Sequence, residues 1–262
     1  MDKVILVDGN NLLFRSYYAT AYTGNIMKNS KGFPTNGLYG FVNMINKIIA
    51  EENPKYMMVA FDIGKTFRHE KYDDYKGGRK ETPEDLKMQF PVAKKILTAM
   101  GIKYLECEGY EADDIIGTIS LWCDKDPKYE ALIVSSDKDL LQLISDETTV
   151  KLLKMKDYIM MDKNTFIDTY GFEPIKMIDL KALMGDASDN IPGVKGIGEK
   201  GAIKLIKDYG SVDGIYENID SISGATKNKL IDGKDDAYYS RELVTIYREV
   251  PINVTFNTRN II

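Results

Sequence analysis

The chain has 262 residues, of which 44% are hydrophobic and 29% charged, and its formal net charge is −5. That length fits one large domain or a domain with a smaller helical partner. No apolar run approaches the roughly 20 residues that span a bilayer, and the opening MDKVILVDGN is too short and too quickly acidic for a signal peptide, so we expect a cytoplasmic protein with no membrane partner. Cys107 and Cys123 lie in no C-x-x-C pattern and are expected to be reduced packing residues.

Short apolar runs that end in acidic residues predict the strands. The runs VILVD, YMMVAFD, IKYLE and ALIVSSDKD end at Asp8, Asp62, Glu106, and Asp137 with Asp139. Continuous apolar runs of this length, separated by helical stretches, are typical of buried parallel strands. Crossover helices are predicted over 38–50 and 90–100, and a β-hairpin around Lys156 and Asp157. The predicted fold class is therefore α/β, with a central, mainly parallel sheet flanked by helices.

The stretch EGYEADDIIG crowds three carboxylates, those of Glu111, Asp113 and Asp114, ahead of a helical apolar pattern that includes Ile115 and Cys123. Acids in the first turn satisfy free backbone N–H groups and complement the helix dipole, so a helix start is the simplest interpretation. Ligands of parallel sheets bind beyond the carboxyl ends of the strands. The aspartates that end the strands would gather along that same edge, which favours a second role for the three acids.

A long charged segment separates Asp62 from Pro91. Between Lys65 and Lys80 it contains six basic and three acidic residues, a local net charge of +3, with aromatic residues among the basic ones. One interpretation is a solvated loop with a short helix; the other is a mobile insertion that grips a polyanion. The only histidine, His69, lies here. We expect it to be an incidental exposed residue, so a histidine-based nucleophilic or zinc mechanism is poorly supported.

Residues 183–206, LMGDASDNIPGVKGIGEKGAIKLI, add two aspartates, two glycine turns and a lysine-bearing helix. GIGEKG matches the dinucleotide pattern G-x-G-x-x-G, but the turn sequence DNIPGVK precedes it where that pattern requires a strand. A helix, a tight glycine hairpin and a second helix fit better, because glycine lets the backbone approach a phosphate that helix-start N–H groups can bind. After YGFEP the sequence pattern changes to one of helices and glycine turns. We therefore predict a domain boundary near residue 170.

Nine carboxylates come from the strand ends, the crowded helix start and this glycine-rich stretch. They are Asp8, Asp62, Glu111, Asp113, Asp114, Asp137, Asp139, Asp186 and Asp189. Unpaired in one cleft they would repel one another, and some would have raised pKa values. Mg²⁺ prefers carboxylate and water oxygens, and two ions about 3.5–4 Å apart stabilise the attacking and leaving oxygens of a phosphodiester displacement. Without these nine charges the net charge of −5 becomes +4, which leaves a basic face for nucleic acid.

Five motifs in order resemble those of the 5′-nuclease family, which includes bacterial flap endonucleases and the N-terminal 5′→3′ exonuclease domain of DNA polymerase I. They are VDGNNLLFR, AFD…TFRHEKYDDYKGGR, GYEADDIIG, SSDKDLLQL and LMGDASDNIPGVKGIGEKGA. The resemblance implies a resolvase-like (PIN-like) nuclease core over 1–170 with a helical arch insertion at about 64–90. It also implies a helical DNA-binding region over 171–262 with a helix-hairpin-helix at about 190–207. Departures are few: Gly201 stands where Thr is common, and KETPEDL has fewer prolines than polymerase-linked relatives.

The resemblance further implies roles for individual residues. The first metal group is Asp8, Asp62, Glu111 and Asp113, with Asp114 close by, and the second is Asp137, Asp139, Asp186 and Asp189. Catalytic contacts from the arch are Arg68, Tyr75, Lys76 and Arg79. DNA contacts from the hairpin are Lys195, Gly196, Gly198, Lys200 and Lys204. The implied cofactors are two Mg²⁺ ions, with Mn²⁺ as a substitute, and K⁺ at the hairpin.

The function predicted from these residues is that of a structure-specific 5′-nuclease in replication and repair. It would act as a 5′→3′ exonuclease and flap endonuclease, hydrolyse DNA by a two-metal-ion mechanism and leave 5′-phosphates. Its partners would be branched, flapped or nicked DNA and a DNA polymerase in cis or in trans, and a monomer suits such an enzyme. Two other classes stay open: a DNA-binding scaffold, which the complete acid set disfavours, and a two-metal phosphatase for small molecules, which has no use for the basic insertion.

Overall fold

The computed structural model describes residues 1–22, 24, 26–155 and 157–254. The strands of this part are β1 (Asp2–Asp8), β2 (Tyr56–Ala60), β3 (Lys103–Leu105), β4 (Tyr129–Ser135), β5 (Thr148–Leu153) and β6 (Tyr158–Met161). They form one sheet in the order β3-β2-β1-β4-β5-β6. All pair in parallel except β6, which runs antiparallel to β5 at the edge. The predicted α/β fold with a mainly parallel sheet is confirmed.

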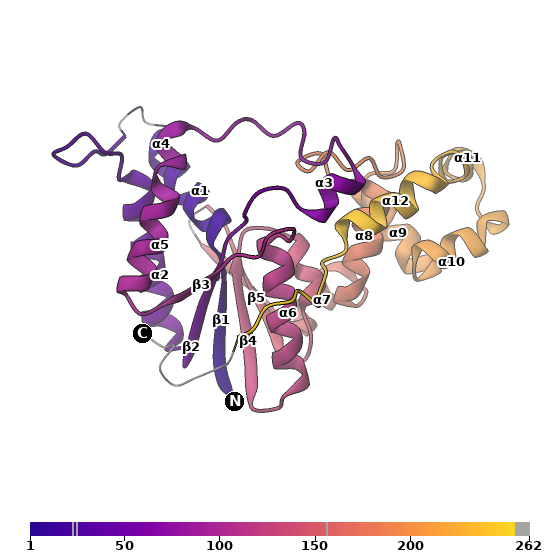
Figure 1. Ribbon diagram of the computed structural model, residues 1–262. Coiled ribbons are helices and arrows are strands. Elements are labelled where there is room, and N and C mark those ends of the chain that lie inside the picture. Colours follow the sequence, from indigo (N-terminus) through magenta and orange to yellow (C-terminus); the bar gives the residue numbers. More distant parts are fainter. Residues whose placement is uncertain (23, 25, 156, 255–262) are drawn as a thin grey trace.

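Helices cover both faces of the sheet and extend beyond one side of it (Figure 1). The first half of the chain forms α1 (Gly9–Ala21), α2 (Asn36–Glu52), α3 (Phe67–Lys71), α4 (Glu84–Lys87), α5 (Gln89–Ala99) and α6 (Ala112–Lys125). The second half forms α7 (Lys163–Tyr170), α8 (Met177–Met184), α9 (Glu199–Tyr209), α10 (Val212–Glu217), α11 (Gly224–Asp232) and α12 (Lys234–Val244). Short 3-10 helices are η1 (Asp139–Leu143), η2 (Pro174–Lys176) and η3 (Ile219–Ser221).

Strand β1 shows how the sequence sets these layers. Successive side chains of a strand point to opposite faces of the sheet. Ile5 packs in the cluster that contains Phe41 of α2, whereas Leu6 packs in the cluster that contains Ile116 of α6. Because helices cover both faces, the strand is apolar without alternation, which is the pattern VILV in the sequence.

The predicted elements correspond closely to observed ones. The helices predicted over 38–50 and 90–100 are α2 and α5, and the apolar pattern from Ile115 to Cys123 lies inside α6. The predicted hairpin consists of β5 and β6. Of its two expected turn residues, Lys156 lies outside the described residues.

The charged insertion crosses the carboxyl ends of the strands. Helix α3 lies near the C-terminal helices and α4 near α5, and residues 72–83 run between them across the top of the sheet (Figure 1). The beginning of this crossing is seated rather than solvated, since Tyr75 is only 4% exposed and packs with Ile191 and Leu243. Tyr75 thus departs from the solvated-loop interpretation, although Asp73, Asp74 and residues 77–80 around it are exposed.

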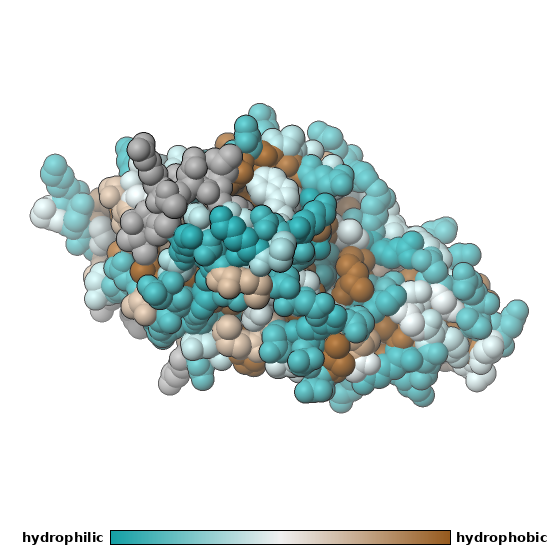
Figure 2. All heavy atoms as spheres, turned by 90° about the horizontal axis from the view of Figure 1, so that it is seen from below, coloured by the Kyte–Doolittle hydropathy of each residue, from teal (hydrophilic) through white to brown (hydrophobic). Residues whose placement is uncertain are grey.

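The side of the molecule opposite the insertion is formed by the amino ends of the strands. Seen from the amino ends of the strands, most of the surface is hydrophilic and the hydrophobic residues form small separate groups (Figure 2). No helix in the described ranges combines the length and the apolarity needed to cross a bilayer.

The glycine hairpin between α8 and α9 is closed by contact between its own backbone segments. Asp186 and Ile191 exchange backbone hydrogen bonds of 2.9 and 2.8 Å. Gly185 and Gly193 have φ values of +71° and +59°, and a Cβ on Gly193 would lie 2.2 Å from the nitrogen of Gly185. Only glycine fits this approach. The helices of the predicted helix-hairpin-helix are α8 and α9, so the unit extends beyond 190–207 at both ends.

We expect Gly193→Ala to lower the free energy of unfolding by about 3 kcal/mol or more, because it adds a backbone clash to the cost of a left-handed residue. Gly210→Ala is the matched control, since Gly210 has φ +83° with nothing within 4 Å of its Cβ position. The control should lose about 1 kcal/mol. Urea denaturation followed by circular dichroism measures both values. Equal losses would show that the close approach at Gly193 is unimportant.

Candidate active site

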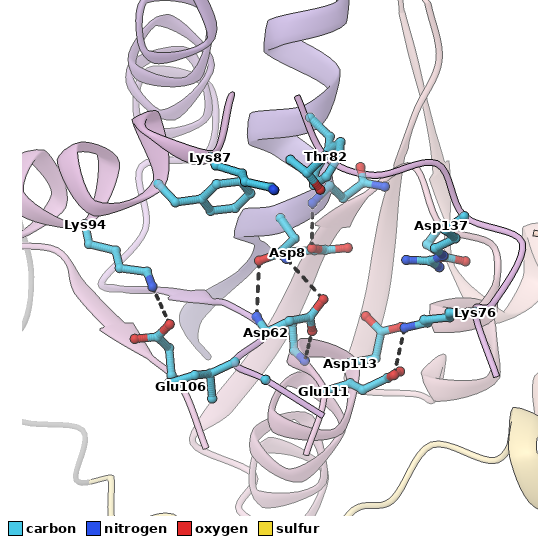
Figure 3. A pocket seen from close by; sticks show the side chains of 18 of the residues that line it. Asp8, Asp62, Lys76, Thr82, Lys87, Lys94, Glu106, Glu111, Asp113 and Asp137 are labelled. Atoms are coloured by element: carbon cyan, nitrogen blue, oxygen red, sulfur yellow. Dashed lines mark hydrogen bonds and ion pairs between the residues drawn. The ribbon is translucent and has the colours of Figure 1, made fainter. Parts of the chain in front are cut away.

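The carboxyl ends of β1, β2 and β4 and the start of α6 surround one open cavity of about 850 Å³. Five of the nine predicted metal-ligating carboxylates line it: Asp8, Asp62, Glu111, Asp113 and Asp137. Basic side chains from the insertion, α4 and α5 line it as well: Lys76, Arg79, Lys80, Lys87 and Lys94. Figure 3 shows the labelled carboxylates converging from separate elements, with Lys76 beside Glu111. The structure thus joins acids that are far apart in the sequence.

Local hydrogen bonds fix the orientation of the acids that end strands. Asp8 caps α1, because one of its carboxylate oxygens accepts from the backbone N–H of Asn11 at 2.9 Å, and the other accepts from the Ser135 hydroxyl at 3.0 Å. Asp62 accepts from Ala112 N at 2.7 Å and from the Asn10 side chain at 3.1 Å. The start of α6 is thereby tied to the end of β2.

Burial and mutual repulsion mark this first group as a place for positive charge. Burial, and then the neighbouring Asp62 and Asp137, raise the pKa of Asp8 to about 7 although the Asn11 N–H opposes the shift. Burial, and then Asp8 and Asp137, raise the pKa of Asp113 well above its ordinary value. Such carboxyl groups take up either a proton or a cation.

The chemistry of these donors fits a hard divalent cation, since all are carboxylate oxygens, which Mg²⁺ and Mn²⁺ prefer. The site therefore fits a divalent cation in its negative charge and in the type of its donor atoms. Within the described ranges no three Asp, Glu, His or Cys side chains stand close enough to form a ready-made metal centre. The two predicted ligand sets therefore stay predictions.

The remaining acids of the predicted second group lie outside the cavity lining and are paired with basic side chains. Lys181 Nζ lies 2.6 Å from Asp139 Oδ1 and 2.5 Å from Asp186 Oδ2. Arg79 pairs with Asp189. Burial and Asp137 raise the pKa of Asp139 to about 7, whereas hydrogen bonds from Lys181 and Ser188 hold the pKa of Asp186 below its usual value against the effect of burial.

Asp114 differs from the other predicted metal ligands in its surroundings, and its predicted place close to the first metal group stays a prediction. Its side chain is fully buried, and both of its oxygens accept two hydrogen bonds. Arg68 donates to both at 2.8 Å, Tyr247 N donates to Oδ1 at 2.8 Å, and Glu111 N donates to Oδ2 at 3.0 Å. With its acceptor positions occupied, Asp114 is a structural anchor at the start of α6.

Arg68 has the contacts of a positioning residue, and its predicted catalytic contact stays a prediction. It is 2% exposed, does not line the cavity and donates to Asp114 and to the carbonyls of Leu243 and Thr245. It joins the base of the insertion to the chain that follows α12.

Tyr75 and Lys76 place positive or donating groups against Glu111. The Tyr75 hydroxyl donates to Glu111 Oε2 at 3.2 Å and to Asp189 Oδ2 at 3.3 Å, so it bridges the two predicted acid groups. Burial, and then Glu111 and Asp189, raise the pKa of Tyr75, so it stays protonated. Lys76 Nζ donates to Glu111 Oε1 at 2.7 Å, and Glu111 raises the pKa of Lys76 although burial opposes its charge. Tyr75 thus orients carboxylates, whereas Lys76 and Arg79 reach the cavity.

His69 is half-buried and has partners, so the expectation of an incidental exposed residue is wrong. Its Nδ1 accepts from Thr66 N at 3.1 Å in a capping box at the start of α3. Its ring also lies edge-on to that of Tyr75, with centroids 5.1 Å apart. The role is local support of the insertion.

Sequence reasoning missed three charged residues of this region. Lys94 and Glu106 form an ion pair and both line the cavity. The available signal for Glu106 is its place at the end of IKYLE, since the other acids that end parallel strands lie at the same edge. The signal for Lys181 is weaker: it is the single lysine of the helix MIDLKALM.

A second groove, of about 720 Å³, lies along the glycine hairpin and the start of α9. Four of the five predicted DNA contacts line it, namely Gly196, Gly198, Lys200 and Lys204, whereas Lys195 is exposed outside the lining. Helix α9 has no side-chain cap, so its first backbone N–H groups are available to a ligand. The opposite wall comes from η3 and α11 and includes Ser223, Thr226 and Lys229.

Comparison with protein families accounts for the whole arrangement. The family described as 5′-3′ exonuclease, N-terminal resolvase-like domain, matches residues 3–171, and that described as 5′-3′ exonuclease, C-terminal SAM fold, matches residues 172–261. The chain belongs to the 5′-3′ exonuclease family. The resemblance predicted from the five motifs is confirmed.

Curated relatives of this exonuclease-family chain include DNA polymerase I of Bacillus subtilis (strain 168), 46% identical over 257 residues, and that of Streptococcus pneumoniae (strain ATCC BAA-255 / R6), 43% identical over 256 residues. The matches cover 97% and 96% of this chain. They cover 29% of each relative, so the chain spans less than a third of their length.

Solved structures share the fold. The bacteriophage T5 flap endonuclease, in a pseudo-enzyme–product complex with DNA and metal ions, gives a TM-score of 0.74 at 24% identity, covering 94% of this chain and 89% of that one. The catalytic core of Rad2 in complex with DNA substrate gives 0.63 at 18% identity, covering 98% and 81%. At these identities the likeness concerns the fold alone.

The raised pKa of Asp8 predicts how pH changes the stability of this exonuclease-family chain without metal. From about pH 4 to pH 7 the folded chain binds more protons than the unfolded one, so stability falls as pH rises. We expect Asp8→Asn, which removes the charge, to raise the free energy of unfolding at pH 8 by about 1–3 kcal/mol and to change it little at pH 4.

Urea denaturation in chelator at both pH values measures the effect. Asp220→Asn is the control, because the Asp220 side chain is 96% exposed and should change stability by less than about 0.5 kcal/mol at either pH. An Asp8→Asn variant no more stable than the wild type at pH 8 would contradict the repulsion at this edge.

Proposed function

We propose that the chain is a metal-dependent, structure-specific 5′-nuclease that acts on DNA as a 5′→3′ exonuclease and flap endonuclease. The observation that carries the proposal is the cavity in which crowded carboxylates meet basic side chains of the crossing insertion. Membership of the 5′-3′ exonuclease family supports it. So do the DNA and metal ions of the T5 structure.

The residues that would hold divalent ions are the eight carboxylates that remain after Asp114 is set aside. The first ion would bind Asp8, Asp62, Glu111 and Asp113, and the second Asp137, Asp139, Asp186 and Asp189. When bound, Mg²⁺ or Mn²⁺ neutralises the crowded carboxylates and supplies positive charge to the attacking and leaving oxygens of phosphodiester hydrolysis. The raised pKa values of Asp8 and Asp113 support this use of the site.

The chain's own residues then position the scissile phosphate. Lys76 and Arg79 face the carboxylates across the cavity and supply fixed positive charge as negative charge develops on the phosphate. Residues 72–83 cross above the cavity, so a 5′ single strand that passes under or through them is guided to it. Attack of water on phosphorus with cleavage of the P–O3′ bond would leave a 3′-hydroxyl on one product and the phosphate on the 5′ end of the other.

The second groove would hold the duplex part of the substrate. Backbone N–H groups at Gly198 and the start of α9, together with Lys200 and Lys204, suit phosphates without reading sequence. For K⁺ the hairpin carbonyls are the candidate ligands, although Gly196 O already accepts from Lys229 Nζ at 3.0 Å. Lys195 would add charge at the rim.

The wider setting is part of the same proposal. The nuclease core would be 1–170 and the DNA-binding region 171–262, acting as a monomer on flapped or nicked DNA in replication and repair. The relatives named DNA polymerase I support a polymerase partner in cis or in trans.

Cleavage of a 5′-labelled flap duplex tests the proposal. With Mg²⁺ we expect short labelled fragments cut near the junction, and none with Ca²⁺ or chelator. Asp8→Ala should lower cleavage by about a thousandfold or more while DNA binding in Ca²⁺ is kept, because it removes a metal ligand and no DNA contact. Asp220→Ala, at an exposed position, should cleave as the wild type does.

Other outcomes would point to other classes. Tight binding without cleavage in Mg²⁺ or Mn²⁺ would favour a DNA-binding scaffold. Neither binding nor cleavage, with hydrolysis of small phosphate esters, would favour a phosphatase. Wild-type turnover by Asp8→Ala would remove the metal assignment.

Lys200→Ala tests the duplex groove separately. We expect weaker duplex binding and a slope of log K against log [salt] that is shallower by about 0.9, the value for one lost phosphate contact. Lys163→Ala is the control, since Lys163 lies on α7 and pairs with Asp146 far from the hairpin in the sequence. Binding measured by fluorescence anisotropy in Ca²⁺ at several salt concentrations gives both slopes. An unchanged curve for Lys200→Ala would remove the groove from the duplex site.

A further inference from the structure

Lys181 holds two of the eight candidate metal-ligating carboxylates together. It lies on α8, its side chain is 13% exposed, and its Nζ is 2.6 Å from Asp139 Oδ1 and 2.5 Å from Asp186 Oδ2. Asp139 begins η1 after β4, whereas Asp186 follows α8. One ammonium group therefore neutralises acids from two separate segments.

The contact with Asp139 is one of charge rather than of a formed hydrogen bond. Asp139 Oδ1 is buried and has no hydrogen-bond partner in the described part of the chain, although the ammonium lies at ion-pair distance. Asp114 differs, because four aligned N–H groups occupy its oxygens. Asp139 Oδ1 is thus held by the charge of the Lys181 ammonium, which a competing cation would have to displace.

The two acid groups differ in how their charge is balanced. In the first group, Glu111 pairs with Lys76, whereas Asp8, Asp62 and Asp113 have no ion-pair partner among the described residues. In the second group, Lys181 serves Asp139 and Asp186, and Arg79 serves Asp189. Three of the four acids of the first group thus have no cation from the chain, whereas three of the four acids of the second group have one.

We propose that Lys181 is a built-in counter-cation that competes with the second divalent ion. The chain would take up its first divalent ion at the first group, where only Glu111 has a basic partner, and the second would bind only after the Lys181 ammonium leaves Asp139 and Asp186. This inference rests on the proposed function, because it takes these carboxylates as metal ligands. It adds a form of regulation to that site, because the second divalent ion can bind only when the Lys181 ammonium has moved away.

The physical reason is that an ammonium and a divalent ion cannot share the same two carboxylates at short range. Their repulsion in a partly buried site is far larger than in water. Removal of the ammonium leaves uncompensated negative charge, which raises the affinity for any other cation. The effect therefore shows in ion binding itself, before any DNA is present.

Calcium titration of the DNA-free chain by calorimetry tests the inference. We expect the wild type to bind one Ca²⁺ over the range of Ca²⁺ concentration in which Lys181→Met binds two. The Kd of the second site should be lower in the variant by about tenfold or more. Lys181→Arg keeps the charge and should behave as the wild type. Lys176→Met removes a lysine that pairs with Asp179 on the same part of the chain and should also leave the stoichiometry unchanged.

A measurement on the wild type keeps the test independent of whether the variants fold. The side-chain NMR signal of Lys181, assigned through Lys181→Arg, should stay in place with the first equivalent of Ca²⁺ and shift only at the higher concentrations that fill the second site. A shift with the first equivalent, or none at saturation of two ions, would overturn the inference.

The outcomes separate this inference from the proposed function. Two equal ions in the wild type, unchanged in Lys181→Met, would overturn the role of Lys181 while flap cleavage in Mg²⁺ still stood. Absence of ion binding together with absence of flap cleavage would remove both.

Discussion

Repulsion among like charges at the carboxyl edge of the sheet is the constraint on which this molecule depends. A parallel sheet brings the ends of β1, β2 and β4 together: β1 ends in Asp8, and Asp62 and Asp137 follow β2 and β4 by two residues. The acids along that edge differ in whether a basic side chain offsets their charge. It leaves Asp8 and Asp113 without a basic partner, with raised pKa values, and it covers Asp139 and Asp189 with Lys181 and Arg79. Acids without a basic partner lower the stability of the folded chain at the positions that need a cation from solution, whereas ion pairs reduce that cost at Asp139 and Asp189.

The base of the insertion and the acid loop after α8 behave as one hydrogen-bonded unit. Lys76 N donates to Asp189 O at 2.9 Å, and the Asn190 side chain donates to Asp74 O at 2.9 Å. Both Lys76 and Asn190 have φ of +57°, a conformation uncommon outside glycine that persists where surrounding contacts hold it. The basic residues and the carboxylates are therefore held in register by the backbone as well as by their charges.

The sequence was sufficient to predict which acids lie at the carboxyl edge of the sheet. It was not sufficient to predict which of them face the cavity and which are paired with basic side chains. Strand ends follow from local apolar runs, and parallel topology then places Asp8, Asp62 and Asp137 together, so these could be predicted. Whether Asp113 or Asp114 faces the cavity could not, since the answer lies in Arg68, 46 residues away, and Tyr247, 133 residues away. Pairing at such separation leaves no local pattern. For Lys181 the distant partner is Asp139, at the start of η1, whereas Asp186 follows Lys181 by five residues.

Arg68 also makes the order of assembly matter. Its guanidinium donates to Leu243 O and Thr245 O, which follow it by 175 and 177 residues. Contacts of such separation form late, because the intervening chain must first be ordered. During synthesis the sheet and every carboxylate emerge before these two carbonyls do. A growing chain thus contains all the candidate metal-ligating acids before Arg68, at the base of the insertion, can donate to Leu243 O and Thr245 O. The contacts that complete the cleft come from residues near the end of the described part of the chain.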